Sequence, residues 1–429
     1  MLKYLPLILI LVNFSPVIPG EYLRVQHLVV YPLFLYAVCM NARRFISSLQ
    51  IKEVGFVFLF FFLMICWGGI STIIMKFKGF WNLIGVLSAT DSLVLPIAVI
   101  CIVSYCINHL EVLYTKRLFI KCINIYIIIM IIDGLLILLH VFTGISYLFE
   151  FFVDSNRDGS VSEKALSMGR YTGIFNQPFE AGLASSLGMF LIFFRIKYFQ
   201  KIHRLDFIGF VIIPFVGILS VSKAFLLICP PLLLIYLIHK NQIWVKHLLI
   251  FLFFTLIGIM ILFTFVIRHW NGADVLLRYL DTNSIKDINS GISRYSSGRY
   301  TEDSSVREKM LYIISNDPVF GFGMSWRQGD GNDVFDGAID SAYLQALIYG
   351  GIPSLVFYLL LLWTIFRIAC AHRKLSPMES SFLLFFILYV FLAGSGAPCF
   401  PQHKFTVAFF TMFTLLIHIM AKQQIIQNQ

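Results

Sequence analysis

Charge is scarce in this chain of 429 residues, of which only 13% are Asp, Glu, Lys or Arg. The eight cysteines form no C-x-x-C pair and no Cys/His grouping with zinc-ligand spacing, so the sequence indicates neither a structural zinc site nor disulfides. No basic patch interleaved with aromatic residues is present, and we therefore expect no nucleic-acid partner despite the net charge of +10. No internal repeat or low-complexity linker divides the chain.

Hydrophobic residues are abundant instead, at 59% of the chain with 44 Phe, which is far above the share in soluble domains. Apolar runs long enough to span a bilayer recur from end to end, and we count about twelve of them. We therefore predict an all-α polytopic membrane protein that forms a single integral membrane domain over residues 1–429. The predicted spans are 3–19, 25–40, 54–75, 83–107, 118–143, 178–194, 207–221, 223–239, 248–267, 341–366, 377–396 and 404–421.

The loops between these runs predict the orientation, because short cytoplasmic loops are enriched in Lys and Arg. Most basic residues outside the two long loops lie on the side of the N-terminus, whereas the short loops of the other side hold Arg24, Lys76, Lys78, Lys223 and Lys404. We expect both termini in the cytoplasm and the long loops 144–177 and 268–340 on the outer side. The first run is kept as a span, because "FSPVIPG" lacks the small-x-small pattern of signal-peptide cleavage.

Loop 268–340 concentrates charge: residues 268–309 hold seven bases and six acids, whereas residues 310–340 hold one base, Arg327, and five acids. Ser305 and Glu308 form a capping-box pattern, and the apolar residues that follow predict a short amphipathic helix over about 306–315. Asn316-Asp317-Pro318 should end this helix. Gly321 and Gly323 then permit bends or close approaches, and together with Pro318 they are predicted to shape the loop. A Gly-x-Gly with no strand before it does not by itself indicate phosphate binding.

The loop closes with "DSAYLQALIYGGIPS", residues 340–354. The Asp340 carboxylate, at the lip of the next span, could accept a proton from a hydroxyl at the membrane surface. Asp340 or Ser341 could equally cap the N-terminus of the following helix. Both roles stay open at the level of sequence.

The other long loop ends in "SMGRYTGIFNQPFEAGL", residues 167–183, where Arg170 and Asn176 are donors at the depth of lipid headgroups. Snorkelling and helix capping are the alternative roles for these residues. Lys223, in "LSVSKAFLL", stands at an outer edge that is otherwise poor in charge. An ammonium group buried there needs an anion, and a diphosphate headgroup is favoured over snorkelling.

Two further patterns carry weaker signals. Asp133 lies in the middle of a span and shares a helix face with His140, which suggests a functional acid or, more simply, a structural pair within the bundle. Asp154, Asn156, Asp158 and Gly159 match the first half of a calcium loop. Ala165 stands where that loop requires a bidentate Glu, which favours a polar turn over a calcium site.

Together, the outer-loop motifs resemble those of the O-antigen polymerase and ligase superfamily, the Wzy-type polymerases and WaaL-type ligases. The resemblance is carried by residues 167–183, 219–227 and 297–354. "RYTGIFNQP" is similar to the family's Arg-x-x-Gly-x-Phe-x-Asn-Pro segment, and "SVSKAF" to its Ser-Arg/Lys segment. "DPVFGFG" and "DSAYLQALIYGGIPS" are similar to its Pro-x-Phe-Gly-x-Gly motif and to the polar pair that precedes a Tyr-Leu and a Gly-containing turn. Arg307 is the better match to the family arginine, with Arg299 as the alternative.

The resemblance implies a GT-C-like fold in the bacterial inner membrane and an activity. An O-antigen polymerase joins undecaprenyl-diphosphate-linked oligosaccharide units on the periplasmic face, without a metal or cofactor, alongside membrane lipid and possible partners such as a chain-length regulator and a flippase. Asp340 and Arg307 are then the expected catalytic residues. The expected contacts to diphosphate and glycan are Arg170, Asn176, Lys223, Arg294, Arg299 and Tyr343.

The ligases depart from this chain at one position. They typically carry a His-Asn pair where this sequence has Asp340-Ser341, which favours a polymerase over a ligase that transfers polysaccharide to lipid A-core. A flippase for lipid-linked oligosaccharide is the alternative from another class. Transporters tend to concentrate polar residues near the midplane, and this chain concentrates them in an outer loop.

Overall fold

The computed structural model describes residues 2–16, 25–40, 51–79, 81–145, 152, 161–175, 177–238, 260, 263–270, 272–274, 276, 305–325, 341–396, 398–400 and 403–428. Every longer regular element in these ranges is a helix. The helices are η1 (Leu2–Tyr4), α1 (Leu5–Leu11), η2 (Val12–Phe14), α2 (Val25–Met40), α4 (Lys52–Phe77), α5 (Leu83–Ile107), α6 (Val112–Thr143), α8 (Val161–Ser167), α9 (Pro178–Phe199), α10 (Arg204–Leu219), the π-helix η3 (Ala224–Ile228), α11 (Cys229–Ile238), α15 (Ser305–Asn316), α16 (Ala342–Ala371), α17 (Pro377–Ala393) and α18 (His403–Asn428).

Six helices of the described chain are long and apolar enough to cross a membrane, namely α4, α5, α6, α9, α16 and α18. Shorter apolar helices cover Leu5–Phe14, Val25–Cys39, Ala224–Ile238 and Pro377–Ala393. The prediction of a helical membrane protein is therefore confirmed, whereas a total of twelve spans stays a prediction. Most of the predicted span 248–267 lies outside the described residues.

Several helix ends differ from the predicted ones. Helix α6 begins at Val112 instead of residue 118, because the basic segment "TKRLF" continues the helix beyond the apolar run. Helix α10 begins at Arg204 and ends at Leu219, where a turn separates it from η3. Helix α16 continues to Ala371 but is broken at Gly350 and Gly351, whose dihedral angles are not helical.

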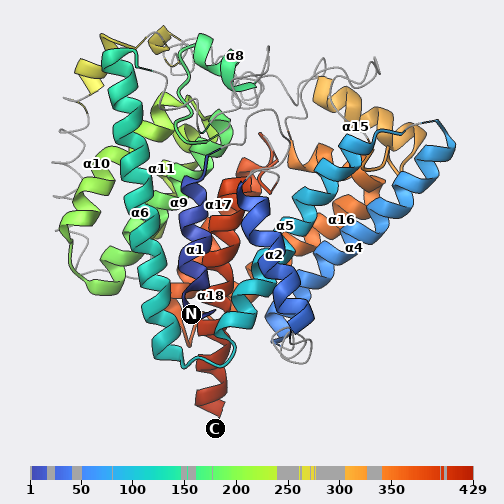
Figure 1. Ribbon diagram of the computed structural model, residues 1–429, viewed down its shortest axis with the longest axis horizontal. Helices are drawn as coiled ribbons and strands as arrows, with labels where there is room; N and C mark the ends of the chain where they lie inside the picture. Colours follow the sequence, from blue (N-terminus) through green and yellow to red (C-terminus); the bar gives the residue numbers. More distant parts are fainter. Residues whose placement is uncertain are drawn as a thin grey trace.

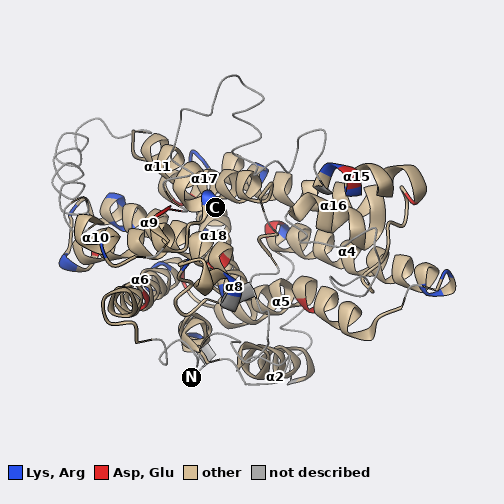
Figure 2. Ribbon diagram, turned by 90° about the horizontal axis from the view of Figure 1, so that it is seen from above, with Lys and Arg blue, Asp and Glu red and all other residues tan. Residues whose placement is uncertain are grey.

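Helix α18 stands in the middle of the bundle. It packs against α5, α6, α9 and α17, with α6, α9, α10 and α11 on one side and α4, α5 and α16 on the other (Figures 1 and 2). In the most apolar 18-residue stretch of α18, 100% of the residues are buried, whereas in that of α4 the share is 33%. Helix α18 is thus the central helix of the bundle, and α4 is the less buried of the two.

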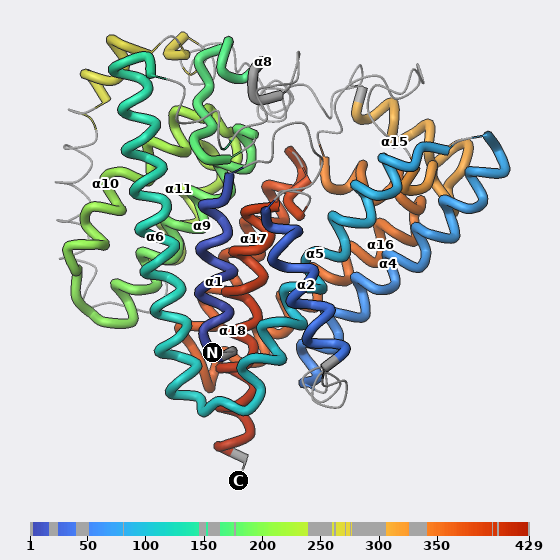
Figure 3. Tube along the Cα trace, viewed as in Figure 1, coloured from blue at the N-terminus to red at the C-terminus, as the bar shows by residue number. Residues whose placement is uncertain are grey.

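The molecule has two distinct ends. Helices α8 and α15 lie at one end, which we call the loop end, and the chain termini lie toward the other, the terminal end (Figure 3). The Lys3 ammonium lies 5.5 Å from the ring centre of Tyr114, and the Lys422 ammonium donates to the carbonyls of Ile107 and Leu110 at 2.8 and 2.6 Å. Both termini therefore contact the same turn between α5 and α6.

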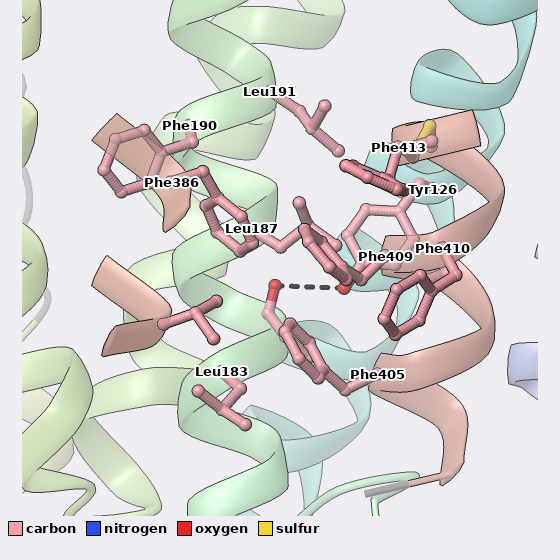
Figure 4. Close-up of a cluster of buried hydrophobic side chains, with 14 of the residues drawn as sticks. Tyr126, Leu183, Leu187, Phe190, Leu191, Phe386, Phe405, Phe409, Phe410 and Phe413 are labelled. Atoms are coloured by element: carbon pink, nitrogen blue, oxygen red, sulfur yellow. Dashed lines mark hydrogen bonds between the residues drawn. The ribbon is translucent and has the colours of Figure 1, made fainter. Parts of the chain in front are cut away.

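Aromatic rings fill the core around α18. Phe405, Phe409 and Phe413 recur every four residues along one face of α18, with neighbouring ring centres 5.8 and 5.7 Å apart. Phe386 of α17 lies 5.5 Å from Phe190 of α9, and the Tyr126 hydroxyl donates to the Ala184 carbonyl at 3.1 Å (Figure 4). Because lipid tails are as apolar as these side chains, close packing of the rings stabilises the bundle around α18 more than burial from water does.

A buried ion pair at the terminal end gives a separate test of how two of the helices, α9 and α10, are held together. Arg195 Nε of α9 donates to Asp206 Oδ1 of α10 at 2.7 Å, and the two side chains are 6% and 0% exposed. Removing one partner leaves a buried charge, so we expect Asp206→Ala to lower the free energy of unfolding by about 3–5 kcal/mol. Equilibrium unfolding in mixed micelles measures this.

The matched control is Lys78→Ala, which breaks the pair between Lys78 Nζ and Asp317 Oδ1, 2.6 Å apart, whose lysine is 47% exposed. The loss there should stay below about 1 kcal/mol. Equal losses in the two variants would contradict the structural role of Arg195 and Asp206.

Candidate functional site

Arg170 joins the segment after α8 to the end of α10. Its Nε donates to the Ser220 carbonyl at 3.1 Å and its Nη2 to the Val221 carbonyl at 3.3 Å. The Tyr171 amide donates to the Leu219 carbonyl at 2.9 Å. These carbonyls belong to the last turn of α10 and the residues after it, which need donors from outside the helix. A guanidinium there also matches the negative end of the helix dipole.

The turn that Arg170 holds leads directly to Lys223. Val221 has a φ of +49°, which is an outlier for a β-branched residue and marks a strained turn. Close packing maintains the turn, since a Cβ on Gly182 would lie 2.0 Å from Ser222 Oγ. Lys223 follows at the N-cap of the helical run of η3 and α11. A cation and the positive end of a helix therefore occur together here, which favours the binding of an anion. We call Arg170, Val221 and Lys223 the Lys223 corner.

Helix α6 supports the Arg170 segment through two side chains of one face. Asp133 Oδ1 accepts a hydrogen bond from the Ile174 amide at 2.8 Å, and the His140 ring lies edge-on to Tyr171 with centres 4.9 Å apart. Burial raises the pKa of Tyr171, so its phenol stays protonated at neutral pH. The structure thus gives Asp133 the Ile174 main chain as its hydrogen-bond partner, and the intramembrane acid holds a loop.

The same support explains the glycine of "RYTG". Gly173 has a φ of +59°, and a Cβ there would lie 2.0 Å from Asp133 Oδ1. Only a glycine allows both the left-handed backbone and the close approach of the carboxylate. The segment is therefore shaped to fit over Asp133.

A buried lysine connects this region to α18. Lys404 is 2% exposed, and its ammonium donates to the carbonyls of Ser15 and Ile174 at 3.1 and 2.6 Å. The Glu180 carboxylate, at the start of α9, accepts from the amides of Lys404 and Phe405 at 2.8 and 3.3 Å. We call Lys404, Glu180, Asp133 and the main chain of Ile174 and Ser15 the Lys404 network.

The segment "NDPVFGFG" contacts "YGGIP" of α16, which is the point where that helix is broken. The Ile352 amide donates to the Pro318 carbonyl at 2.7 Å, and the Phe322 amide donates to the Ile348 carbonyl at 2.8 Å. Trp67 Nε1 of α4 donates to the carbonyls of Gly350 and Val319 at 2.9 and 3.2 Å. The break frees backbone groups that have no water to bind within a membrane, and this segment satisfies them.

The two glycines of the segment sit at its closest approaches. Gly321 has a φ of +58° and a Cβ there would lie 2.2 Å from the Leu347 carbonyl oxygen. Gly323 has a φ of +73°, and its Cβ would lie 2.8 Å from Thr72 Cα. The Met324 amide donates to Thr72 Oγ1 at 2.8 Å. The segment is thus a wedge between α4 and α16, which we call the 318–324 wedge.

Helix α15 packs on α16 just before the wedge. Val306 and Ile313 are buried against Leu344, Leu347 and Ile348. The predicted amphipathic helix is confirmed, and Asn316 ends it as expected. Arg307 lies on the exposed face of α15.

Tyr343 belongs to the first turn of α16. Its ring lies 6.0 Å from that of Tyr358, and Ser341 caps the helix, with its hydroxyl accepting from the amides of Tyr343 and Leu344 at 3.2 and 3.5 Å. Ser341 is therefore the N-cap that the sequence left open between two residues.

A small, mostly apolar pocket lies beneath this first turn of α16. It is lined by Phe61, Met64, Ser92, Leu93, Ala342, Gln345, Ala346, Tyr349, Ser354, Tyr358, Cys399 and Phe400.

The predicted site residues fall into two groups. The first group is Arg170 and Lys223, near the end of α10. The second group, which we call the α16 group, contains Arg307, Tyr343, Pro318, Gly321 and Gly323. Helices α11 and α15 lie apart in both views (Figures 1 and 2). Asn176, Arg294, Arg299 and Asp340 lie outside the described residues, as do the calcium-loop residues Asp154, Asn156, Asp158 and Gly159.

Sequence reasoning missed one polar cluster. His27 of α2, Asp91 of α5 and His403 of α18 bring their side chains together, with Tyr31 hydrogen-bonded to Asp91. Their separation in the sequence hides the cluster. The acid Asp91 within a predicted span was the one signal that could have pointed to it.

The wedge predicts a sharp difference between two glycines. Gly321→Ala should lower the melting temperature in detergent and expose residues 316–325 to protease, because the new Cβ would clash with the Leu347 carbonyl of α16. Gly69→Ala, on α4, meets no atom within 4 Å, and it should be neutral or stabilise the helix by up to about 1 kcal/mol. A Gly321→Ala protein as stable as Gly69→Ala would contradict the wedge.

The Lys404 network predicts energetic coupling between Lys404 and Asp133, which bind the carbonyl and the amide of Ile174, respectively. In a double-mutant cycle of Lys404→Met and Asp133→Asn, we expect a coupling energy of about 0.5–3 kcal/mol. Lys404→Met with Asp206→Asn, which share no partner, should be additive. Additivity in both cycles would show that Ile174 does not connect the two residues.

Comparison with known proteins finds no match: no family model matches the chain, and no curated protein or solved structure matches it either. Its function is therefore argued from the residues and their geometry.

Proposed function

We propose that the protein is an inner-membrane O-antigen polymerase, which joins undecaprenyl-diphosphate-linked oligosaccharide repeat units on the periplasmic face. The proposal assigns the loop end to the periplasm and both termini to the cytoplasm, as the distribution of Lys and Arg predicts. The observation that carries it is the corner at the end of α10. There Arg170 fixes a strained turn that places Lys223 at the N-terminus of a helical run.

This corner fits the diphosphate of a lipid carrier. Lys223 is half-buried, and an ammonium withdrawn from water is stabilised by an anion. Charge-assisted hydrogen bonds from Lys223 and from the amides that begin the helical run suit phosphate oxygens. Arg170 is engaged with carbonyls of the turn, so its proposed part is to position Lys223.

The reaction needs a good leaving group and an oriented acceptor. The acceptor sugar hydroxyl attacks the anomeric carbon of the donor glycan, the bond from that carbon to the diphosphate oxygen breaks, and undecaprenyl diphosphate leaves. A cation at the corner stabilises the charge that develops on the diphosphate. We propose Asp340 as the carboxylate that takes the hydroxyl proton. Ser341 already caps α16, which leaves this role to its neighbour.

The α16 group fits the glycan or the lipid tail. Arg307 stands on the exposed face of α15, with Tyr343 on the helix that α15 covers. The small pocket at the first turns of α16 is lined mainly by apolar side chains, which suits an apolar part of the lipid carrier. Because this group lies apart from the Lys223 corner, we propose that it holds the far part of the acceptor glycan, while the reacting hydroxyl reaches the diphosphate at the corner.

Lys223→Met tests the proposal in a strain that lacks the chromosomal gene. Loss of a charged hydrogen bond worth about 1.5–3 kcal/mol should reduce long-chain lipopolysaccharide at least about tenfold, with single-repeat lipopolysaccharide retained. Lys223→Arg should keep part of the activity, since it keeps the charge. Lys76→Met is the matched control, because Lys76 lies over the Trp81 ring at 4.5 Å, in the last turn of α4 and away from the Lys223 corner.

The lipopolysaccharide gel and an assay of lipid transport separate the alternatives. Bare core without any repeat would indicate a ligase that acts on lipid A-core. A purified protein that moves labelled lipid-linked oligosaccharide between leaflets, yet never lengthens a glycan, would indicate a flippase. Normal ladders in Lys223→Met would remove the corner from the site.

A further inference from the structure

Three helices that are distant in the sequence converge on one carboxylate near the loop end. His27 Nε2, from the start of α2, lies 3.1 Å from Asp91 Oδ2 of α5, and His403 Nδ1, from the start of α18, lies 3.2 Å from the same oxygen. The three potential ligand atoms all lie within 4.8 Å of one another. We call His27, Asp91 and His403 the His–Asp–His cluster.

The spacing of the cluster matches a metal coordination sphere. Zinc binds histidine nitrogen and carboxylate oxygen at about 2.0–2.2 Å in tetrahedral geometry, which puts neighbouring ligand atoms about 3.3 Å apart. The two nitrogen-to-oxygen distances of 3.1 and 3.2 Å are close to that edge. Two histidines and one carboxylate form the ligand set of an open site, in which a fourth position takes water or a substrate.

Neighbouring groups fix the orientation of these ligands. The Tyr31 hydroxyl donates to Asp91 Oδ1, which leaves Oδ2 turned toward the histidines. The His27 ring stacks on Tyr31 with centres 5.7 Å apart and meets His403 edge-on at 5.3 Å. Support of this kind around the first ligands is what metal sites use to hold a carboxylate and to set its basicity.

The side chains are also largely withdrawn from solvent. Those of His27, Asp91 and His403 are 9%, 17% and 16% exposed. Polar side chains within apolar helices are costly unless they serve a function or bind a partner. A comparable pair elsewhere, His372 Nε2 and Glu53 Oε1 at 3.3 Å, has one histidine only, so it provides an internal comparison.

We propose that His27, Asp91 and His403 bind a divalent transition-metal ion, with zinc as the best match to two imidazoles and one carboxylate. The ion would join α2 and α5 to the N-terminus of the central helix α18. This proposal stands independently of the polymerase function, since none of its ligands belongs to the corner or to the α16 group.

Metal binding by the full-length protein in detergent tests the proposal. After treatment with a chelator and dialysis against zinc, atomic emission should find one zinc ion per chain. His27→Ala and His403→Ala should each reduce bound zinc at least tenfold, while His372→Ala should keep one ion. Cobalt should give the visible absorption of a tetrahedral site, and Asp91→Asn should remove it.

A milder variant guards against misfolding of the ligand variants. Tyr31→Phe keeps all three ligands and should weaken zinc binding about 10- to 100-fold. Zinc should also raise the melting temperature of the native protein and of His372→Ala, but not that of His27→Ala. A native protein that takes up no zinc, or a His27→Ala protein that binds as much as the native one, would show that the cluster is only a hydrogen-bonded ion group.

Discussion

The buried ammonium of Lys404 is the constraint on which the loop end depends. A lysine that is 2% exposed at the top of the central helix must have its hydrogen bonds satisfied by protein. Its donors go to the carbonyls of Ser15 and Ile174, which fixes the end of η2 and the segment after Arg170. Asp133 accepts from the Ile174 amide, and Glu180 accepts from the amides at the start of α18. The Lys404 network therefore joins the end of η2 to α6, α9 and α18.

The position of Lys223 follows from this network. Ile174 is held by Lys404 and Asp133. Arg170 precedes it by four residues, and the Arg170 guanidinium donates to the carbonyls of Ser220 and Val221. Val221, whose carbonyl accepts one of these hydrogen bonds, adopts a strained φ of +49°. The strain is maintained by packing that was already needed for the bundle, so the corner is preorganised before any ligand arrives.

The sequence predicted the helical membrane architecture and several local backbone features better than it predicted which segments contact one another. Apolar runs of spanning length mark the helices because each must satisfy its own backbone in lipid. The end of α15 at Asn316 and the need for glycine at 321 and 323 followed from local backbone rules. That "NDPVFGFG" fills the break at "YGGIP" could not be predicted, because it depends on hydrogen bonds between segments far apart in the chain. The cluster of Asp91, His27 and His403 could not be predicted for the same reason. Asp133 was identified from its position within a span, but its partner could not be predicted, because a main-chain amide has no sequence signal.

The central claim is that the lipid diphosphate binds at the corner formed by Arg170, Val221 and Lys223. The most direct measurement is an electron cryomicroscopy map of the protein in a lipid nanodisc with undecaprenyl diphosphate. The account predicts density for the diphosphate within hydrogen-bonding distance of Lys223 Nζ, with Arg170 still on the turn. Diphosphate density beside Arg307 or at the His–Asp–His cluster, with none at Lys223, would contradict it.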